Sequence, residues 1–422
     1  MESHILWALI MAFSVTMYTI FDGFDLGVGI LLPFIKQGEE RDIAVNSITP
    51  VWDGNETWIV LMGVGMFGGF PNAYSLLLPA LYLPVILMVI SLALRGVAME
   101  YRFITAGFKN SWTLAFTAGS VMAAFCQGII LGNLMEGIVH TNTPGKLVPV
   151  FHFLSPFTLV TGFVLIVSYA LIGATWLNFK TSGILQKKTR KIARILIFTL
   201  GILLLLIVYG RFHFPLFNPR FGVFGLQNVL TLPSLLWYFS GALLLAVMLW
   251  TLGKQPDWLP FTLNIIFTLI SAIYILAGFW PFIVPPDLTI YNAGSPAYGN
   301  AVLLTSAFVI IPVILTYLVY SYTVFRGKVI RQNNYEPNTP FLHQLGNGAR
   351  KTNLLVPERP VYLSWPIRMV ISLAGMIFFF IVLGFLGNAA ALAAIFLFAV
   401  IFLFCWWLNT SKSVSSRTGN KR

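Results

Sequence analysis

Long apolar runs, separated by short polar loops, repeat along the whole chain. Each of eleven runs has roughly the 20 residues that a helix needs to cross a bilayer. They lie at 5–32, 51–70, 75–97, 112–138, 153–177, 193–211, 229–252, 260–284, 299–325, 366–384 and 389–408. The runs are continuous, whereas the strands of a membrane barrel are shorter and alternate between apolar and polar residues. The pattern therefore predicts an all-α polytopic membrane protein.

The last apolar block, 366–408, is expected to be a transmembrane hairpin that turns at 384–388. A single helix of that length would reach about 64 Å, roughly twice the thickness of the hydrocarbon core. The preceding stretch is polar and rich in Asn, Pro and basic residues. We therefore expect a transmembrane core (1–326), a polar cytoplasmic linker (327–365), the hairpin, and a basic cytoplasmic tail (409–422).

Composition and charge support a membrane protein and predict its orientation. Of the 422 residues, 58% are hydrophobic and 9% are charged, whereas soluble proteins carry about 25% charged residues. The net charge of +12 does not indicate nucleic-acid binding, because the basic residues lie in loops between apolar runs. Leaving aside the four Lys and Arg residues of the tail, an outer N-terminus places 19 Lys and Arg residues on the cytoplasmic side and 3 on the outer side. The positive-inside rule therefore predicts an outer N-terminus and an inner C-terminus.

The first run contains two acidic residues, Asp22 and Asp25, in the phrase FDGFDLGVG. A carboxylate within the hydrocarbon region is costly, and it usually has a function or a specific partner. The two aspartates are three residues apart and share one helix face. They form either a proton- or ion-binding pair or a structural pair neutralised by a basic residue, and Arg95 of the third run is the candidate for a bidentate partner. Gly23 and Gly27 predict a close approach of another helix.

The second run begins with PVWDGNETW, which places Asp53 and Glu56 in the first turns of a helix. The helix dipole favours negative charge there. These acids are either the cytoplasmic mouth of a proton path, with Asp53 as the first acceptor, or interfacial side chains that cap the helix. Trp58 lies about 9 Å deeper than Trp52 along the helix, which is less typical of an interfacial tryptophan.

Histidine and cysteine positions argue against a haem or metal site in this chain. None of the five histidines falls in the middle of an apolar run, so no bis-histidine haem site is predicted. Cys126 and Cys405 lie in apolar runs and form no metal-binding or haem-attachment motif. One alternative that these features leave open is a free-standing secondary transporter or ion carrier that uses the buried carboxylates. We find no matched pair of interrupted helices of the kind that many transporters have.

Several phrases together resemble subunit II of cytochrome bd-type quinol oxidases. They are DGFDLGVG, NSITPVWDGNETW, GGFPNAY and LRGVAMEYR, followed in the same order by GNLMEG, SPFTLVTG, GATWL and FWPFIVP. The resemblance covers roughly residues 1–330. It implies nine core helices, arranged as two four-helix bundles plus a peripheral helix, in a bacterial-type inner membrane.

The resemblance also implies a function for the complex. Such enzymes oxidise membrane quinol and reduce dioxygen to water, with haems b and d and the quinol site in subunit I, a separate chain. This chain is then a non-haem subunit, not catalytic alone, that pairs with subunit I. Small accessory membrane subunits and a structural quinone or lipid between the helices are left open.

The resemblance assigns roles to five residues. Asp53 corresponds to the proton-uptake position, where Glu56 joins it as a candidate from its place in the same helix turns, and Trp58 corresponds to the mouth of a hydrophobic oxygen route. Asp22, Asp25 and Arg95 correspond to the family's buried polar cluster, which is either structural or part of a proton relay.

Overall fold

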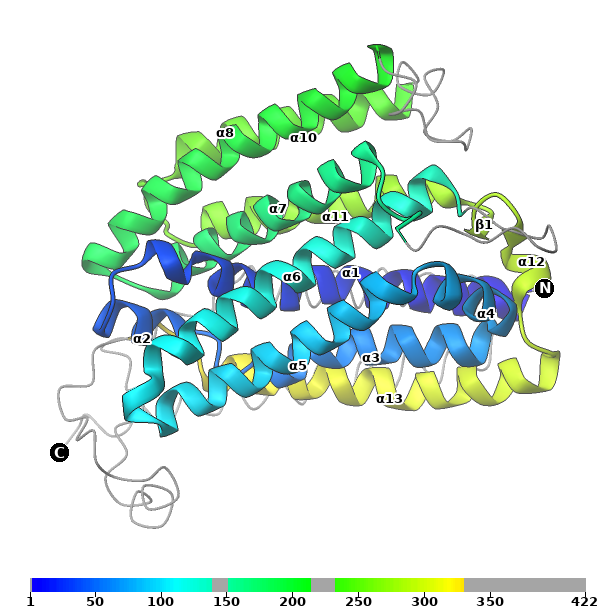
Figure 1. The fold of residues 1–422 in the computed structure, drawn as a ribbon, viewed down its shortest axis with the longest axis horizontal. Helices are drawn as coiled ribbons and strands as arrows, with labels where there is room; N and C mark the ends of the chain where they lie inside the picture. The colour runs from blue at the N-terminus through cyan, green and yellow to red at the C-terminus, as the bar shows by residue number, and fades with distance from the viewer. Residues whose placement is uncertain (1, 139–150, 214–231, 330–422) are drawn as a thin grey trace, which may run out of the picture.

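The computed structural model describes residues 2–138, 151–213 and 232–329. The predicted hairpin 366–408, the tail 409–422 and nearly all of the linker 327–365 lie outside these residues. Figure 1 shows long helices lying side by side, with α8 and α10 along one edge of the bundle and α13 along the opposite edge.

Ten long helices make up the described fold: α1 (Glu2–Leu31), α3 (Trp52–Gly69), α4 (Pro71–Ala80), α5 (Tyr82–Ile104), α6 (Lys109–Glu136), α7 (Pro156–Lys180), α8 (Gly183–His213), α10 (Leu232–Thr251), α11 (Leu259–Phe279) and α13 (Ala297–Val324). Among the described residues, eight of them are long and apolar enough to cross a membrane alone. The bent pair α3 and α4 makes a ninth if it is counted as one span. The prediction of an all-α polytopic membrane protein is confirmed.

Short elements connect the long helices. They are η1 (Leu32–Phe34), α2 (Glu39–Asn46), η2 (Ala106–Phe108), α12 (Ile290–Ala293) and the antiparallel strands β1 (Phe282–Val284) and β2 (Leu288–Thr289). The predicted span 260–284 was wrong at its end, because α11 stops at Phe279 and β1 follows. Pro281 cannot donate a backbone hydrogen bond, which disfavours continuation of the helix.

The predicted third span, 75–97, was wrong at both ends. Residues 71–80 form α4, which is bent by 117° from α3. The bend falls at Phe70, which is not helical (φ −134°, ψ 62°) and precedes Pro71; a proline disfavours the α-conformation of the residue before it. Helix α5 starts at Tyr82 and continues to Ile104, so that Arg102 lies in its last turn and is buried.

Helix α1 is central and packs against α3, α6, α7 and α13. It meets α7 at two glycines, Gly27 and Gly173, where the backbones touch: a Cβ added to Gly27 would collide with the carbonyl oxygen of Tyr169 and lie 2.8 Å from the Gly173 nitrogen. The close approach predicted from the glycines of the first run is confirmed at Gly27. This contact joins the first group of helices (α1, α3, α5 and α6) to the second (α7, α8, α10 and α11).

We expect Gly27→Ala to destabilise the protein by about 1–3 kcal/mol, because the added methyl group overpacks the contact between α1 and α7. Thermal unfolding of the purified protein, followed by tryptophan fluorescence, measures the effect. Gly201→Ala is the matched control, since a Cβ at Gly201 of α8 meets nothing within 4 Å. Equal melting temperatures for the two variants would contradict the proposed role of the contact.

Candidate functional site

A buried polar cluster lies where α1, α3 and α5 meet. Asp22 and Asp25 come from the second half of α1 and are 0% and 1% exposed. Arg95 comes from the middle of α5 and is 1% exposed, and Asn55 of α3 is fully buried. Charged groups at such depth are stable only when they are paired and hydrogen-bonded, so their partners determine what the cluster can do.

Arg95 connects two carboxylates that belong to different helices. Its Nη1 donates to Asp22 Oδ1 at 2.5 Å, and its Nη2 lies 3.4 Å from Glu56 Oε1. The predicted pairing of Arg95 with one of the two aspartates is therefore confirmed. The predicted bidentate geometry is wrong, because only Nη1 donates to Asp22, whereas Nη2 lies at ion-pair distance from Glu56 of α3 and forms no hydrogen bond with the described residues.

Asp25 has a different set of partners from Asp22, although the two share one face of α1. Its Oδ2 accepts a hydrogen bond from Asn55 Nδ2 at 2.8 Å. The Asn55 Oδ1 in turn accepts one from the Tyr322 hydroxyl of α13 at 2.9 Å. Sequence analysis missed both partners: Asn55 lies inside the WDGN phrase, but nothing in the sequence connects it with Tyr322, 267 residues away.

The cluster contains more carboxyl groups than cations. Asp22, Asp25 and Glu56 surround Arg95, and the described residues supply no second cation to them. Asp22 Oδ2 and Asp25 Oδ1 are buried and have no hydrogen-bond partner in the described part of the chain. Each of these oxygens has a free lone pair on which a proton or a water molecule can bind. Because one cation cannot neutralise three carboxylates, burial and mutual repulsion favour a proton on at least one of these carboxyl groups.

The second pair of predicted acids lies at the start of α3. Asp53, in the first turn, is exposed, whereas the Glu56 side chain is 24% exposed and reaches Arg95. Together with buried Asp22, they form a series of carboxyl groups that goes from an exposed position to a buried one. The structure brings Glu56 into contact with the buried cluster, but it gives no contact from Asp53 to Arg95.

Three further polar side chains lie next to the cluster. Gln127 Nε2 of α6 donates to the Tyr18 hydroxyl of α1 at 2.8 Å, and the Tyr169 hydroxyl of α7 donates to Gln127 Oε1 at 2.7 Å. Tyr18 precedes Asp22 by four residues, which places it one turn away on the same face of α1. Polar contacts therefore extend from α3 and α5 through α1 to α6 and α7.

Trp58 is fully buried and is not an interfacial residue. Its ring packs edge-on against Phe13 of α1, with centroids 5.4 Å apart. Phe13 also lines a cavity of about 1790 Å³ between the helices, whose lining is mostly apolar but includes Tyr18, Gln127 and Tyr169. The indole of Trp58 therefore supports one wall residue of this cavity.

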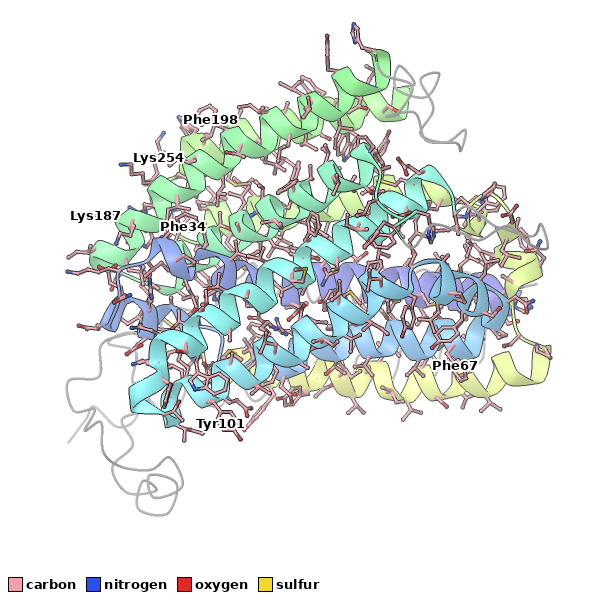
Figure 2. The ribbon with its side chains drawn as sticks, in the orientation of Figure 1. Phe34, Phe67, Tyr101, Lys187, Phe198 and Lys254 are labelled. Carbon is pink, nitrogen blue, oxygen red and sulfur yellow. The ribbon has the colours of Figure 1, made fainter. Side chains whose placement is uncertain are left out.

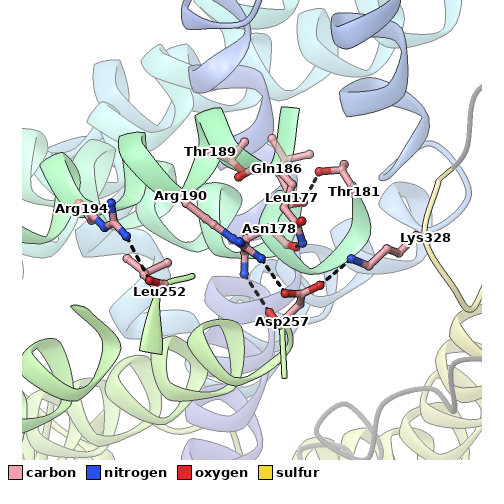
Figure 3. A network of polar contacts seen from close by, with 10 residues as sticks. All are labelled: Leu177, Asn178, Thr181, Gln186, Thr189, Arg190, Arg194, Leu252, Asp257 and Lys328. Atoms are coloured by element: carbon pink, nitrogen blue, oxygen red, sulfur yellow. Dashed lines mark hydrogen bonds and ion pairs between the residues drawn. The ribbon is translucent and has the colours of Figure 1, made fainter. Parts of the chain in front are cut away.

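A second ionic cluster ties helix ends together and is shown in Figure 3. Asp257, between α10 and α11, binds Arg190 of α8 at 2.7 Å and Lys328, beyond α13, at 2.6 Å. Arg190 Nε also donates to Asn178 Oδ1 of α7 at 2.7 Å. Burial acts to raise the pKa of the Asp257 carboxyl, but the hydrogen bond from Lys328 and the charges of Lys328 and Arg190 outweigh it, so that this pKa lies below its ordinary value.

The segment after α13 has a second attachment beside this cluster. The backbone nitrogen of Val329 donates to the carbonyl oxygen of Lys180, at the end of α7, at 2.7 Å. The Lys180 ammonium is buried, donates to the carbonyl oxygen of Phe325 and lies over the Trp176 ring. These contacts fix the point at which the chain leaves the described core.

Comparison with known proteins assigns the family. A family model described as cytochrome bd terminal oxidase subunit II matches residues 3–325. The chain belongs to that family. It is 27% identical to cytochrome bd-I ubiquinol oxidase subunit 2 of Escherichia coli strain K12, covering 80% of this chain and 98% of that one. It is 26% identical to cytochrome bd ubiquinol oxidase subunit 2 of Bacillus subtilis strain 168, with the same coverage of the two chains.

The fold agrees with this assignment. The structure of bd oxidase from Geobacillus thermodenitrificans superposes with a TM-score of 0.64 at 19% identity, over 77% of this chain and 99% of that one. The resemblance noted in the sequence is thus confirmed, and the alternative of a free-standing transporter is not supported. The chain is a multi-pass subunit of a terminal oxidase complex in a bacterial inner membrane, and a partner subunit I that carries haem is implied. Within the described residues, no group of three His, Cys, Asp or Glu side chains could hold a metal ion.

We expect Arg95→Ala to destabilise this bd oxidase subunit by about 3–5 kcal/mol, because it leaves Asp22 buried without its cation. The double variant Asp22→Asn/Arg95→Gln removes both charges and should recover part of the loss. Thermal unfolding of the purified complex, together with its yield from membranes, measures both. A wild-type melting temperature for Arg95→Ala would show that the pair is not structural.

The low pKa of Asp257 predicts a pH dependence of stability. A carboxyl group whose folded-state pKa is lowered stabilises the fold above its unfolded pKa of about 3.9, and this contribution is lost as the pH falls through the folded-state pKa. The difference in melting temperature between wild type and Asp257→Asn should therefore be constant between about pH 5 and 7 and shrink below about pH 4. Melting curves of both proteins over this range test it. A difference that stays constant to the lowest pH would contradict the ionic role of Asp257.

Proposed function

We propose that this chain is the non-haem subunit of a complex that oxidises membrane quinol and reduces dioxygen to water. The relatives from Escherichia coli and Bacillus subtilis are named ubiquinol oxidase subunits, which supports quinol as the electron donor. Haems b and d and the quinol site then belong to subunit I, and this chain is not catalytic alone. The series of carboxyl groups from exposed Asp53 through Glu56 to the buried cluster is the observation that carries the proposal.

Reduction of dioxygen consumes protons, and we assign their uptake to the start of α3. Asp53 is exposed at the helix terminus that we place on the cytoplasmic side, with the N-terminus of the chain outside and the C-terminus inside. Glu56 lies one turn further and is partly exposed, so it can accept a proton from Asp53 and release it toward a partner chain. Arg95 does not carry the proton, because a guanidinium stays protonated. It holds Glu56 and Asp22 at fixed positions.

We propose that subunit I covers the face formed by α3, α5 and α13. This face carries Glu56, whose side chain is 24% exposed, and a carboxylate that faced lipid there would be costly. It also exposes large apolar side chains, among them Val60 and Phe67 of α3 and Val313 of α13. Figure 2 shows Phe67 and Tyr101 on this side of the bundle. A partner would bury the apolar side chains and receive protons from Glu56. Accessory membrane subunits would contact other faces.

The large apolar cavity suits two other expected roles, a route for dioxygen and a binding place for a structural quinone or lipid. Its lining favours dioxygen, which is apolar, and Phe13 links its wall to Trp58; we assign Trp58 to the side of an oxygen route. The same cavity has room for the tail of a structural quinone or lipid. Tyr18, Gln127 and Tyr169 would then meet the polar head of that molecule.

We expect Asp53→Asn to slow quinol-dependent oxygen consumption about tenfold or more, a loss typical of removing a proton-transfer group. The complex is purified through a tag on this chain, and its reduced-minus-oxidised spectrum reports the haem of the co-purified subunit I, which should be unchanged. Glu100→Gln, an exposed acid on α5, is the matched control. Wild-type turnover in Asp53→Asn would exclude the proton-uptake role, whereas purification without haem or a second subunit would overturn the oxidase assignment of the chain.

A further inference from the structure

The first turns of α8 carry five basic residues. Two of them face the protein and pair with carboxylates: Lys188 lies 3.1 Å from Glu40, and Arg190 lies 2.7 Å from Asp257. Three others, Lys187, Lys191 and Arg194, are exposed and form no ion pair with any described residue. Two of the five basic side chains thus have acidic partners within the described part of the chain, and the three exposed ones have none there.

The outward cations form one continuous surface with the end of α10. Lys187, Lys191 and Arg194 are spaced by four and three residues, which places them on one stripe of α8. Arg194 Nη2 donates to the carbonyl oxygen of Leu252, and the neighbouring Lys254 is exposed, with its ammonium over the Trp250 ring. We call Lys187, Lys191, Arg194 and Lys254 the α8–α10 cationic strip. Figure 2 shows Lys187 and Lys254 at the same end of this edge of the bundle.

Next to the strip, the exposed side chains on this edge of the bundle are apolar. Ile195, Phe198 and Ile202 of α8 are 57%, 63% and 66% exposed, and Trp250 of α10 is 66% exposed. Phe198 lies about 10 Å from Lys191 along the helix. Figure 2 shows Phe198 further along α8 than Lys187. Exposed cations, followed along α8 by exposed apolar side chains, match a molecule with an anionic head and hydrocarbon tails.

We propose that the α8–α10 cationic strip is a binding site for an anionic phospholipid, whose phosphate lies against Lys187, Lys191, Arg194 and Lys254. Charge complementarity favours this occupant over a zwitterionic lipid, because four cations without described acidic partners attract a net negative headgroup. The acyl chains would then cover Ile195, Phe198 and Trp250. The lipid phosphate would neutralise the exposed cations of the strip, as Glu40 neutralises Lys188 and Asp257 neutralises Arg190. This assignment does not depend on the proton path proposed above.

The test uses the assembled oxidase complex in nanodiscs of phosphatidylcholine, with and without phosphatidylglycerol. The variant Lys187→Gln/Lys191→Gln/Lys254→Gln removes three charges, and Lys187→Arg/Lys191→Arg/Lys254→Arg retains them. Arg194 is left intact because it also contacts α10. The single variant Lys254→Gln removes one charge of the strip. Its matched control is Lys36→Gln, which removes an exposed cation in the loop after α1.

Native mass spectrometry after transfer to detergent counts the retained lipids. We expect the wild type, the Arg variant and Lys36→Gln to retain phosphatidylglycerol in preference to phosphatidylcholine. The triple Gln variant should retain roughly 100-fold less phosphatidylglycerol, since each surface cation contributes about a fivefold preference, and Lys254→Gln should fall between. Equal retention in the triple Gln variant, or equal retention of both lipids by the wild type, would overturn the proposal. So would complete displacement of phosphatidylglycerol by inorganic phosphate alone, which would make the strip an anion site rather than a lipid site.

Discussion

The position of a single guanidinium determines how the first three spans fit together. Arg95 is buried in α5 and reaches one carboxylate on α1 and another on α3. A buried ion pair is weak evidence for stability, because the two charges must first lose their water. We infer that it acts in specificity, since a defined rotation and depth of α5 are needed to bring Arg95 to both partners. Any other arrangement would leave a charge alone in the membrane, which is costly.

The packing of α1 against α7 works with this electrostatic constraint. Gly27 and Gly173 allow the two backbones to touch within two residues of Asp25, so the acids of α1 lie close to the second group of helices as well. Asn55 and Tyr322 extend the same cluster to α13. Four separate regions of the chain thus meet around two aspartates. In a membrane, where lipid is as apolar as the side chains, such polar and small-residue contacts direct helix association.

Much of this arrangement could be predicted from local sequence. Apolar runs gave the helices, the spacing of Gly23 and Gly27 indicated a close contact, and the excess of acids in the first run required a cation such as Arg95. The contacts that sequence missed are those in which both partners lie on distant helices, as with Asn55 and Tyr322. The contact of Arg95 with Glu56 was also missed, because the rotation of α5 relative to α3 is set by packing. The break after residue 70 was predicted, but the separate helix α4 at residues 71–80 was not, because its apolar residues continue the hydrophobic pattern of the next span.

The attachment of Lys328 and Val329 to the core has a consequence for whatever chain follows. These residues are held by Asp257 and by the end of α7, so the following segment begins at a fixed origin rather than at the end of a free helix. The carbonyl oxygen of Phe325 is held at the same place by the Lys180 ammonium, so the end of α13 is fixed relative to both α7 and the connection between α10 and α11.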